Sequence, residues 1–239
     1  MLTVCQYIAF CTYSNGENGV LKLVPPQSNE VVILKKLLTI EDSHNPILPG
    51  IRIAELASAP SYSLVQMPEG KEIVYRDHAA NLLDLAIQLV TGVMFLHDHN
   101  IAHLDIKRDN LLLSSTGKLS IIDFSVSQFA ENSTTFTGFT GTKGCVAPEV
   151  DQGRPFSPFS ADKWACGKIL KDMACACSGL RFLPGILLQA MCLTDSDPSK
   201  RPPLLLIIQN LRKVQETVYY AESKIPGKRK PYLHRDSVA

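Results

Sequence analysis

The first part of the chain has the pattern of a small sheet with one helix. Apolar stretches rich in valine, leucine, tyrosine and phenylalanine predict strands over residues 4–13, 20–24 and 63–67. The Asn-Gly pairs in SNGENG, residues 14–19, are typical of a turn that joins the first two strands as a hairpin. SNEVVILKKLL, residues 28–38, begins with a Ser/Asn capping signal and continues with apolar residues at helical spacing.

The hydrophobic pattern becomes more helical further along the chain. Residues 79–98 give the clearest helix, because apolar positions recur at helical spacing and polar positions fill the opposite face. Short strands are predicted at residues 110–113 and 119–122, on either side of a Ser-Thr-Gly turn. A stretch rich in Ser, Thr, Asn and Gly then runs to residue 146, longer than a plain connection, which indicates a functional or mobile segment. Helices return between residues 163 and 218.

Composition sets the broad class of the protein. With 239 residues, 45% of them hydrophobic, the chain can bury a sizeable core. The 24 Lys+Arg and 23 Asp+Glu residues balance, so nothing in the totals calls for a nucleic-acid or membrane partner. The opening MLTVCQYIAFCTY has no basic leader, and no apolar run reaches the ~18 residues of a membrane span, so we expect an intracellular protein, cytoplasmic or nuclear. Seven cysteines without CxxC spacing are expected to be reduced.

Two polar segments after the long helix carry candidate chemistry. HLDIKRDN, residues 103–110, is followed by an apolar strand and then by IIDFS, residues 121–125. The pair resembles the catalytic loop and the metal-binding segment of the eukaryotic-type protein kinase superfamily. Further segments that resemble the family follow in the right order: VLKL (20–23), GTKGCVAPE (141–149), DKWACG (162–167) and DPSKRP (197–202).

The resemblance implies an α+β fold with two lobes. Residues 1–66 would form a reduced N-terminal β-sheet lobe with a short helix, and residues 67–70 the hinge. Residues 71–218 would form a mainly helical C-terminal lobe with the catalytic loop and activation segment. The remaining residues, 219–239, are polar and are expected to be a disordered tail.

The family's chemistry maps onto the two polar segments. By resemblance, Asp105 orients the substrate hydroxyl and accepts its proton, while Lys107 contacts the transferring phosphate, as in Ser/Thr kinases. Asn110 and Asp123 would supply oxygen ligands to Mg²⁺, which bridges the phosphates of ATP. The implied reaction is transfer of the ATP γ-phosphate to a Ser or Thr hydroxyl of a protein substrate.

The N-terminal lobe would hold the nucleotide. Lys22, in an apolar strand, would pair with Glu30 and face the α- and β-phosphates. The residues alone equally describe an edge-strand lysine whose ammonium reaches water. SLVQMPEG, residues 63–70, resembles the hinge strand, with the Met67 carbonyl and the Glu69 N–H facing adenine. Without the resemblance it is an ordinary strand that ends at a Pro-Glu-Gly turn.

Other positions suggest structural roles. Asp162 resembles the residue that accepts hydrogen bonds from the catalytic-loop backbone, and Glu149 with Arg201 resembles a buried ion pair. Thr142 is expected to bond to Asp105 and Lys107. A histidine cluster near the end of the long helix could alternatively suggest zinc, but the surrounding kinase pattern argues against a metal site there: His97, His99 and His103.

The chain also departs from the family pattern. No GxGxxG occurs ahead of Lys22, so the glycine-rich loop over the phosphates is expected to be missing, in a chain either truncated from a longer kinase or naturally reduced. Ser125 stands where the family has glycine, and Leu104 replaces the arginine that would bind a phosphorylated activation segment. These departures motivate an alternative function, a pseudokinase that uses the fold as an interaction scaffold.

Overall fold

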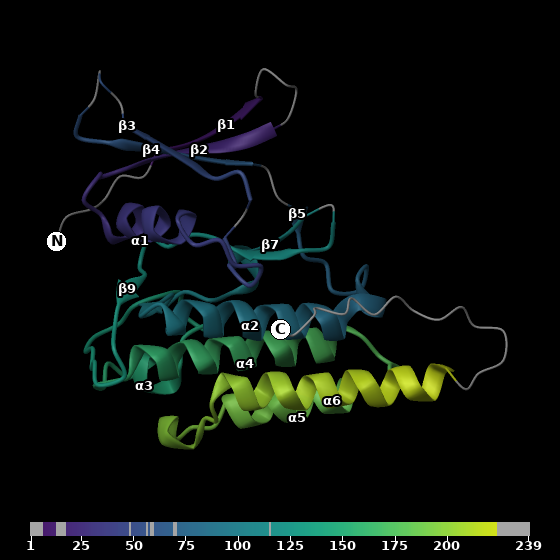
Figure 1. The fold of residues 1–239 in the computed structure, drawn as a ribbon. Coiled ribbons are helices and arrows are strands. Elements are labelled where there is room, and N and C mark those ends of the chain that lie inside the picture. Colours follow the sequence, from purple (N-terminus) through teal and green to yellow (C-terminus); the bar gives the residue numbers. More distant parts are fainter. Residues whose placement is uncertain are drawn as a thin grey trace.

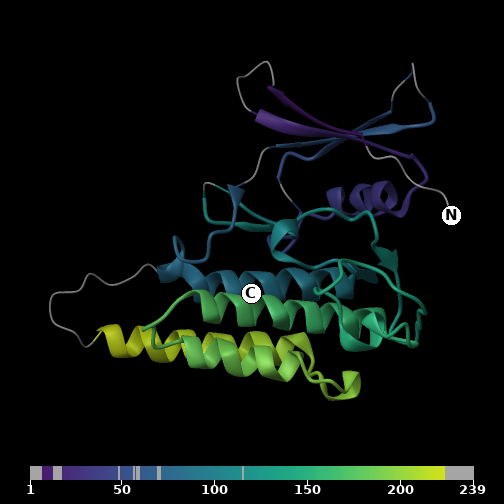
Figure 2. The same cartoon turned by 180° about the vertical axis from the view of Figure 1, so that it is seen from behind.

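The computed structural model has a sheet-bearing lobe stacked on a helical lobe (Figure 1). Figure 2 shows the same two lobes from behind, with the helices lying side by side at the end away from the sheet. This is the predicted α+β architecture. The residues that the structure describes are 7–12, 18–47, 49–55, 57, 60–68, 71–114 and 116–223.

The smaller lobe is built on a four-stranded antiparallel sheet. Its strands are β1 (Tyr7–Thr12), β2 (Asn18–Val24), β3 (Arg52–Glu55) and β4 (Ser63–Pro68), in the order β1-β2-β4-β3. The sequence pattern did not reveal β3, because RIAE is short and mostly exposed and so shows no apolar alternation. β2 is an internal strand, with hydrogen-bonded neighbours on both sides.

Helix α1 (Asn29–Leu38) packs beneath the sheet and begins where the capping signal predicts. Ser28 adopts an extended conformation, and its hydroxyl accepts a hydrogen bond from the Val31 N–H at 3.4 Å. The apolar side of the helix joins the core through Val31, Ile33, Leu34 and Leu37.

The larger lobe is a stack of helices around one central member. Its elements are α2 (Leu82–Asp98), α3 (Pro148–Asp151), α4 (Pro158–Ala176), α5 (Leu183–Leu193) and α6 (Leu204–Ser223). α2 contacts α4, α5 and α6. Contrary to the sequence-based expectation, the segment from residue 79 to residue 98 is by length and composition apolar enough to cross a membrane, but 67% of its most apolar stretch is buried inside the protein. Its apolarity is therefore explained by its place at the centre of the helical core.

Short strands frame the polar segments between the lobes. β5 (Lys71–Glu72), β7 (Leu111–Leu113) and β8 (Leu119–Ile121) form a three-stranded antiparallel sheet. β6 (Ile101–Ala102) pairs with β9 (Gln128–Phe129). Because β6 runs directly into HLDIKRDN and β7 follows it, the two ends of this loop are fixed by strand pairing.

The lobes meet closely at Gly92, in the middle of α2. A Cβ atom added to this glycine would lie 2.9 Å from Cβ of Pro46, so the site has no room for a side chain. The Ile121 N–H donates to the Pro46 carbonyl at 2.7 Å. Asn45, itself buried, donates through Nδ2 to the Leu37 carbonyl at 2.8 Å, which ties this contact to the end of α1.

The boundary of the C-terminal tail differs from the sequence-based expectation. The predicted disordered tail began at residue 219, but α6 continues to Ser223, so residues 219–223 are helical. Tyr219 is partly buried, which gives this last turn of the helix packing that a polar composition does not reveal. Residues 224–239 of the predicted tail lie outside the described part of the chain.

A buried ion pair fastens α3 to the segment before α6. Arg201 donates to both carboxylate oxygens of Glu149, at 2.6 and 2.8 Å, and their side chains are 0% and 4% exposed. Arg201 also donates to the backbone carbonyls of Asp195 and Ser160, at 2.9 Å each. The guanidinium is thus hydrogen-bonded on several sides, which the pairing of two buried charges requires.

We predict that Arg201→Met lowers the free energy of unfolding by about 3–5 kcal/mol, because it leaves the Glu149 carboxylate buried without its partner. Urea denaturation monitored by circular dichroism measures this change. The matched control is Lys168→Met, which breaks the surface pair of Lys168 with Asp172 at 3.6 Å and should change stability by no more than about 1 kcal/mol. Equal effects of the two substitutions would contradict the prediction.

Candidate active site

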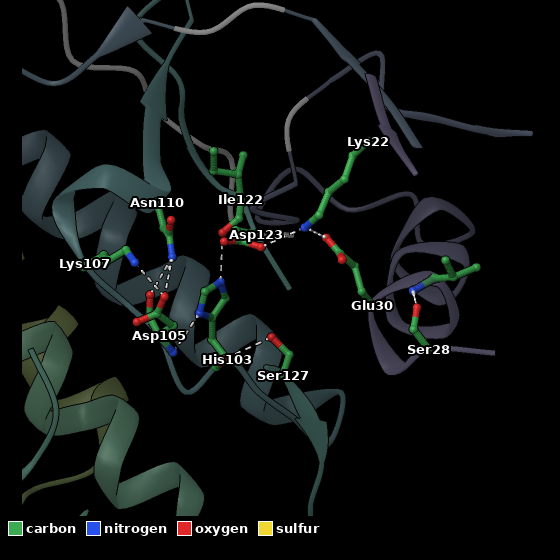
Figure 3. A network of polar contacts seen from close by, with 11 residues as sticks. Lys22, Ser28, Glu30, His103, Asp105, Lys107, Asn110, Ile122, Asp123 and Ser127 are labelled. Atoms are coloured by element: carbon green, nitrogen blue, oxygen red, sulfur yellow. Dashed lines mark hydrogen bonds and ion pairs between the residues drawn. The ribbon is translucent and has the colours of Figure 1, made fainter. Parts of the chain in front are cut away.

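A cluster of three charges, two of them buried, joins three segments of the chain. Lys22 Nζ on β2 lies 2.7 Å from Glu30 Oε1 on α1 and 3.0 Å from Asp123 Oδ1, which follows β8 (Figure 3). The side chains of Lys22 and Glu30 are each 4% exposed. The alternative of an edge-strand lysine reaching water is therefore wrong, because Lys22 is on an internal strand and is buried.

The carboxylates of this cluster respond differently to burial. Burial raises the pKa of Glu30 above its ordinary value, and the nearby Lys22 charge offsets only part of that effect. For Asp123, burial also disfavours the charged form, but the charge and hydrogen bond of Lys22 outweigh it and hold the pKa below its ordinary value. Asp123 therefore remains an anion at neutral pH, beside the Lys22 ammonium.

A second cluster lies on the loop between β6 and β7. Asp105 Oδ2 accepts hydrogen bonds from Lys107 Nζ at 2.8 Å and from Asn110 Nδ2 at 3.2 Å, and Asn110 Nδ2 also donates to the Asp105 carbonyl at 2.8 Å. Figure 3 shows the three side chains turned toward one another. The other oxygen, Asp105 Oδ1, is buried and has no hydrogen-bond partner in the described part of the chain. A buried carboxylate oxygen without a partner is suited to accept a hydrogen bond from a bound group.

The loop conformation depends on a carboxylate from another helix. Leu104 has a φ of 65°, in the left-handed region that non-glycine residues rarely adopt. Asp162, near the start of α4, accepts the His103 and Leu104 N–H groups at 2.8 Å each, and it is 1% exposed. This matches the role expected from the sequence. The two hydrogen bonds stabilise the strained turn that presents Asp105.

The segment after Asp123 packs against the same loop. The Phe124 ring is 1% exposed and lies edge-on to His103, with ring centroids 5.0 Å apart. The positive φ falls on Asp123, at 64°, and not on Ser125. A serine in place of the family's glycine is therefore not strained in this conformation.

The segment between Asp123 and Glu149, the expected activation segment, contacts the loop through Thr142 and Gly141. Thr142 Oγ1 accepts a hydrogen bond from Lys107 Nζ at 2.7 Å, whereas the expected bond from Thr142 to Asp105 is not formed. A Cβ atom on Gly141 would lie 2.5 Å from the Leu104 carbonyl, so only glycine allows this close approach. A cavity of about 10 Å³ next to Asp105, lined also by Thr140 and Cys145, has room for about one water molecule.

The comparison with known proteins identifies the family. The family model described as "Protein kinase domain" matches residues 21–181. The chain belongs to the protein kinase family. It is 31% identical over 186 residues to serine/threonine-protein kinase GRIK1 of Arabidopsis thaliana. The matched stretch covers 70% of this chain and 45% of GRIK1. It is 29% identical over 181 residues to serine/threonine-protein kinase GRIK2 of the same plant, and this match covers 70% of this chain and 44% of GRIK2.

A shorter stretch is 40% identical over 98 residues to serine/threonine-protein kinase 17A of Oryctolagus cuniculus, covering 38% of this chain. The chain spans less than half the length of these relatives. The family match includes Lys22, Asp105 and Asp123, so the two charge clusters belong to the kinase domain.

The kinase site offers oxygen atoms for a magnesium ion. Asn110 donates through Nδ2 to Asp105, so its amide oxygen can serve as a metal ligand. Asp123 accepts from Lys22 through Oδ1, so its Oδ2 can serve as a second ligand. Mg²⁺ prefers oxygen ligands and takes one or two from protein, with water and phosphate oxygens completing its shell. Asn110 and Asp123 therefore fit this ion.

Of the two predicted adenine contacts, one lies within the described part of the chain. Met67 is on β4, opposite Val20 of β2, and Val20 is two residues from Lys22 on the same face of the sheet. This places Met67 on the face of the sheet that carries Lys22. Glu69, the other predicted adenine contact, lies outside the described residues.

The sequence pattern missed some of the residues that shape the site. His103 belongs to the histidine cluster that could have suggested zinc, but both of its ring nitrogens have hydrogen-bond partners. Nε2 bonds to the Ile122 carbonyl at 3.1 Å, and Nδ1 accepts from the Asp105 N–H at 3.3 Å. Ser127, fully buried, donates to the His103 carbonyl at 3.0 Å. Only the histidine of HLD could have been found from the motif, whereas Ser127 carries no signal in the sequence.

We predict that His103 makes stability depend on pH in a defined window. Burial of the imidazole lowers its pKa below 6.5, so between that lowered pKa and about 6.5 the folded kinase binds fewer protons than the unfolded chain. This contribution to stability is complete above pH 6.5 and is lost as the pH falls below it, by up to about 1.4 kcal/mol per pH unit.

Urea denaturation of the wild type and His103→Gln between pH 7.5 and 5.5 measures the effect. The wild type should lose more stability on acidification than His103→Gln. If the wild type and His103→Gln have the same slope, His103 does not titrate in this window.

Proposed function

We propose that the chain is an ATP- and Mg²⁺-dependent kinase that phosphorylates Ser or Thr hydroxyls of a protein substrate. The observation that carries the proposal is the assembly of both charge clusters: Lys22 with Glu30 and Asp123, and Asp105 with Lys107 and Asn110. Phosphoryl transfer needs positioning and charge stabilisation more than covalent chemistry, and these clusters supply both.

Each residue would have a distinct task. Asp105, through the unpartnered Oδ1, would orient the acceptor hydroxyl and take its proton. Burial disfavours the charge on Lys107, but the hydrogen bond to Asp105 and the attraction of the nearby carboxylates together outweigh burial and raise the pKa, so that the ammonium stays positive beside the transferring phosphate. Lys22 would bind the α- and β-phosphates. Bound Mg²⁺, held by Asn110 and Asp123, neutralises charge on the phosphates.

The acceptor class is supported by two observations. Lys107, two residues after Asp105, resembles the lysine of Ser/Thr kinases, and GRIK1, GRIK2 and kinase 17A are all named serine/threonine-protein kinases. The Met67 carbonyl and the Glu69 N–H would bind adenine. The proposed lobe boundaries, with a hinge at residues 67–70, follow from the same assignment.

We predict that Asp105→Asn lowers the rate of phosphate transfer by roughly 10²–10⁴-fold, because asparagine cannot accept the proton of the acceptor hydroxyl. Transfer of radiolabelled phosphate from Mg·ATP to the chain itself and to generic protein substrates measures the rate. Unchanged labelling by Asp105→Asn would sink the catalytic assignment. A control at exposed Asp109→Asn, on the same loop, should leave the rate near that of the wild type.

We predict that Mg·ATP at a hundred times its dissociation constant stabilises the folded protein by about 2.7 kcal/mol, since it binds only the native state. Thermal unfolding with and without Mg·ATP measures this shift. Asp123→Asn should lose the magnesium-dependent part, because a carboxylate ligand is replaced by a neutral amide. Asp105→Asn should keep the whole shift, which separates binding from chemistry.

The scaffold alternative is motivated by Ser125, which follows Asp123 and Phe124 where the family has glycine. Stabilisation by Mg·ATP without detectable transfer would favour a nucleotide-binding scaffold, and no stabilisation would favour a scaffold that does not bind nucleotide. Transfer that depends on Asp105 would exclude a scaffold as the sole function.

A further inference from the structure

Helix α1, which carries Glu30, is tied to the helical lobe near both of its ends. At its start, Asn29 Nδ2 donates to Gln128 Oε1 at 2.7 Å and to the Ser127 carbonyl at 3.4 Å. At its end, Lys36 Nζ donates to the His99 carbonyl at 2.7 Å. These contacts are independent of the Lys22–Glu30 ion pair.

The ring of Phe129 forms a second contact for Lys36. The ammonium lies 5.3 Å from the ring centroid, within the range of a cation–π interaction. Gln128 and Phe129 are the two residues of β9, so Asn29 and Lys36 hold the helix to one short strand. The two ties are seven positions apart on α1, about two helical turns, and lie on the same side of the helix.

Strand β9 is in turn joined to the two segments that carry Asp105 and Asp123. It pairs with β6, with Ile101 opposite Phe129 and Ala102 opposite Gln128. β6 runs into His103 and Asp105, and β9 follows the segment that begins at Asp123. A helix fixed to β9 is therefore fixed relative to both carboxylates.

The neighbouring lysine provides a contrast. Lys35 pairs with Glu55 across the solvent-exposed surface at 3.4 Å, with side chains 51% and 80% exposed. An exposed pair of this kind contributes little. Lys36 is partly buried and bonds to a backbone carbonyl whose position is set by the end of α2.

We infer that Asn29 and Lys36 are positioning residues, which hold α1 against β9 so that Glu30 meets Lys22 without any phosphate on the threonine-rich activation segment. The Lys22–Glu30 pair is formed at 2.7 Å, and Leu104 stands before Asp105 where the family has the arginine that would bind a phosphorylated segment, so this position offers no cation to such a phosphate. The inference rests on the proposed function only for its effect on catalysis. The position of the helix itself is a property of the fold.

The test compares Lys36→Met with Lys35→Met in the full chain. Both remove one charge from the same helix and keep an unbranched apolar stem. Amide hydrogen exchange should become about tenfold faster in α1 of Lys36→Met, because a charged hydrogen bond is lost, while α2 and α4 serve as internal references. Lys35→Met should match the wild type. Lys36→Arg, which keeps the donor and the cation over Phe129, should restore slow exchange.

Kinetics supply the second measurement. Lys36→Met should raise KM for ATP and lower kcat, and Lys36→Arg should recover both. A loss of overall stability alone would lower the amount of active enzyme without raising KM. Treatment of the wild type with a protein phosphatase should change neither the exchange in α1 nor the rate of transfer.

Two results would overturn the inference: equal exchange in α1 of Lys36→Met and Lys35→Met, or release of α1 by phosphatase. A wild type that transfers no phosphate would refute the proposed kinase activity, yet the exchange data would still decide whether Lys36 holds the helix.

Discussion

The arrangement of the site depends on burying one ammonium group between two carboxylates. Lys22, Glu30 and Asp123 come from a strand, a helix and a loop. The Lys22 and Glu30 side chains would each be costly to bury alone, whereas the Asp123 side chain is 36% exposed. Their attraction therefore requires the sheet, α1 and the segment after β8 to come together. The remaining contacts of the site refine this arrangement: Asp162 fixes the loop of Asp105, and Asn45 fixes the end of α1.

Much of this could be predicted from the sequence, because motifs fix residues whose partners are distant. The pairs Lys22–Glu30 and Glu149–Arg201 are formed as expected, even though eight residues separate the first two and 52 the second. Family resemblance supplied these pairs. Periodicity supplied α1 and α2, whose apolar positions match the residues found in the core.

The features that sequence reasoning missed are of a different physical kind. β3 has too few buried positions to produce an alternating pattern. The contacts of Lys36 and Ser127 are made to backbone carbonyls, which every residue possesses, so no residue type marks the acceptor. Likewise the left-handed φ of Leu104 depends on Asp162, far away in the sequence, and leucine gives no local indication of it.

The contact between Gly92 and Pro46 has a mechanical consequence. A glycine inside a core helix costs about 1 kcal/mol relative to alanine, so its place here is explained by the proline that packs against it. Pro46 also accepts a hydrogen bond from Ile121 at 2.7 Å, which leaves this point little freedom to slide. A larger side chain at position 92 would therefore act as a wedge between Pro46 and α2.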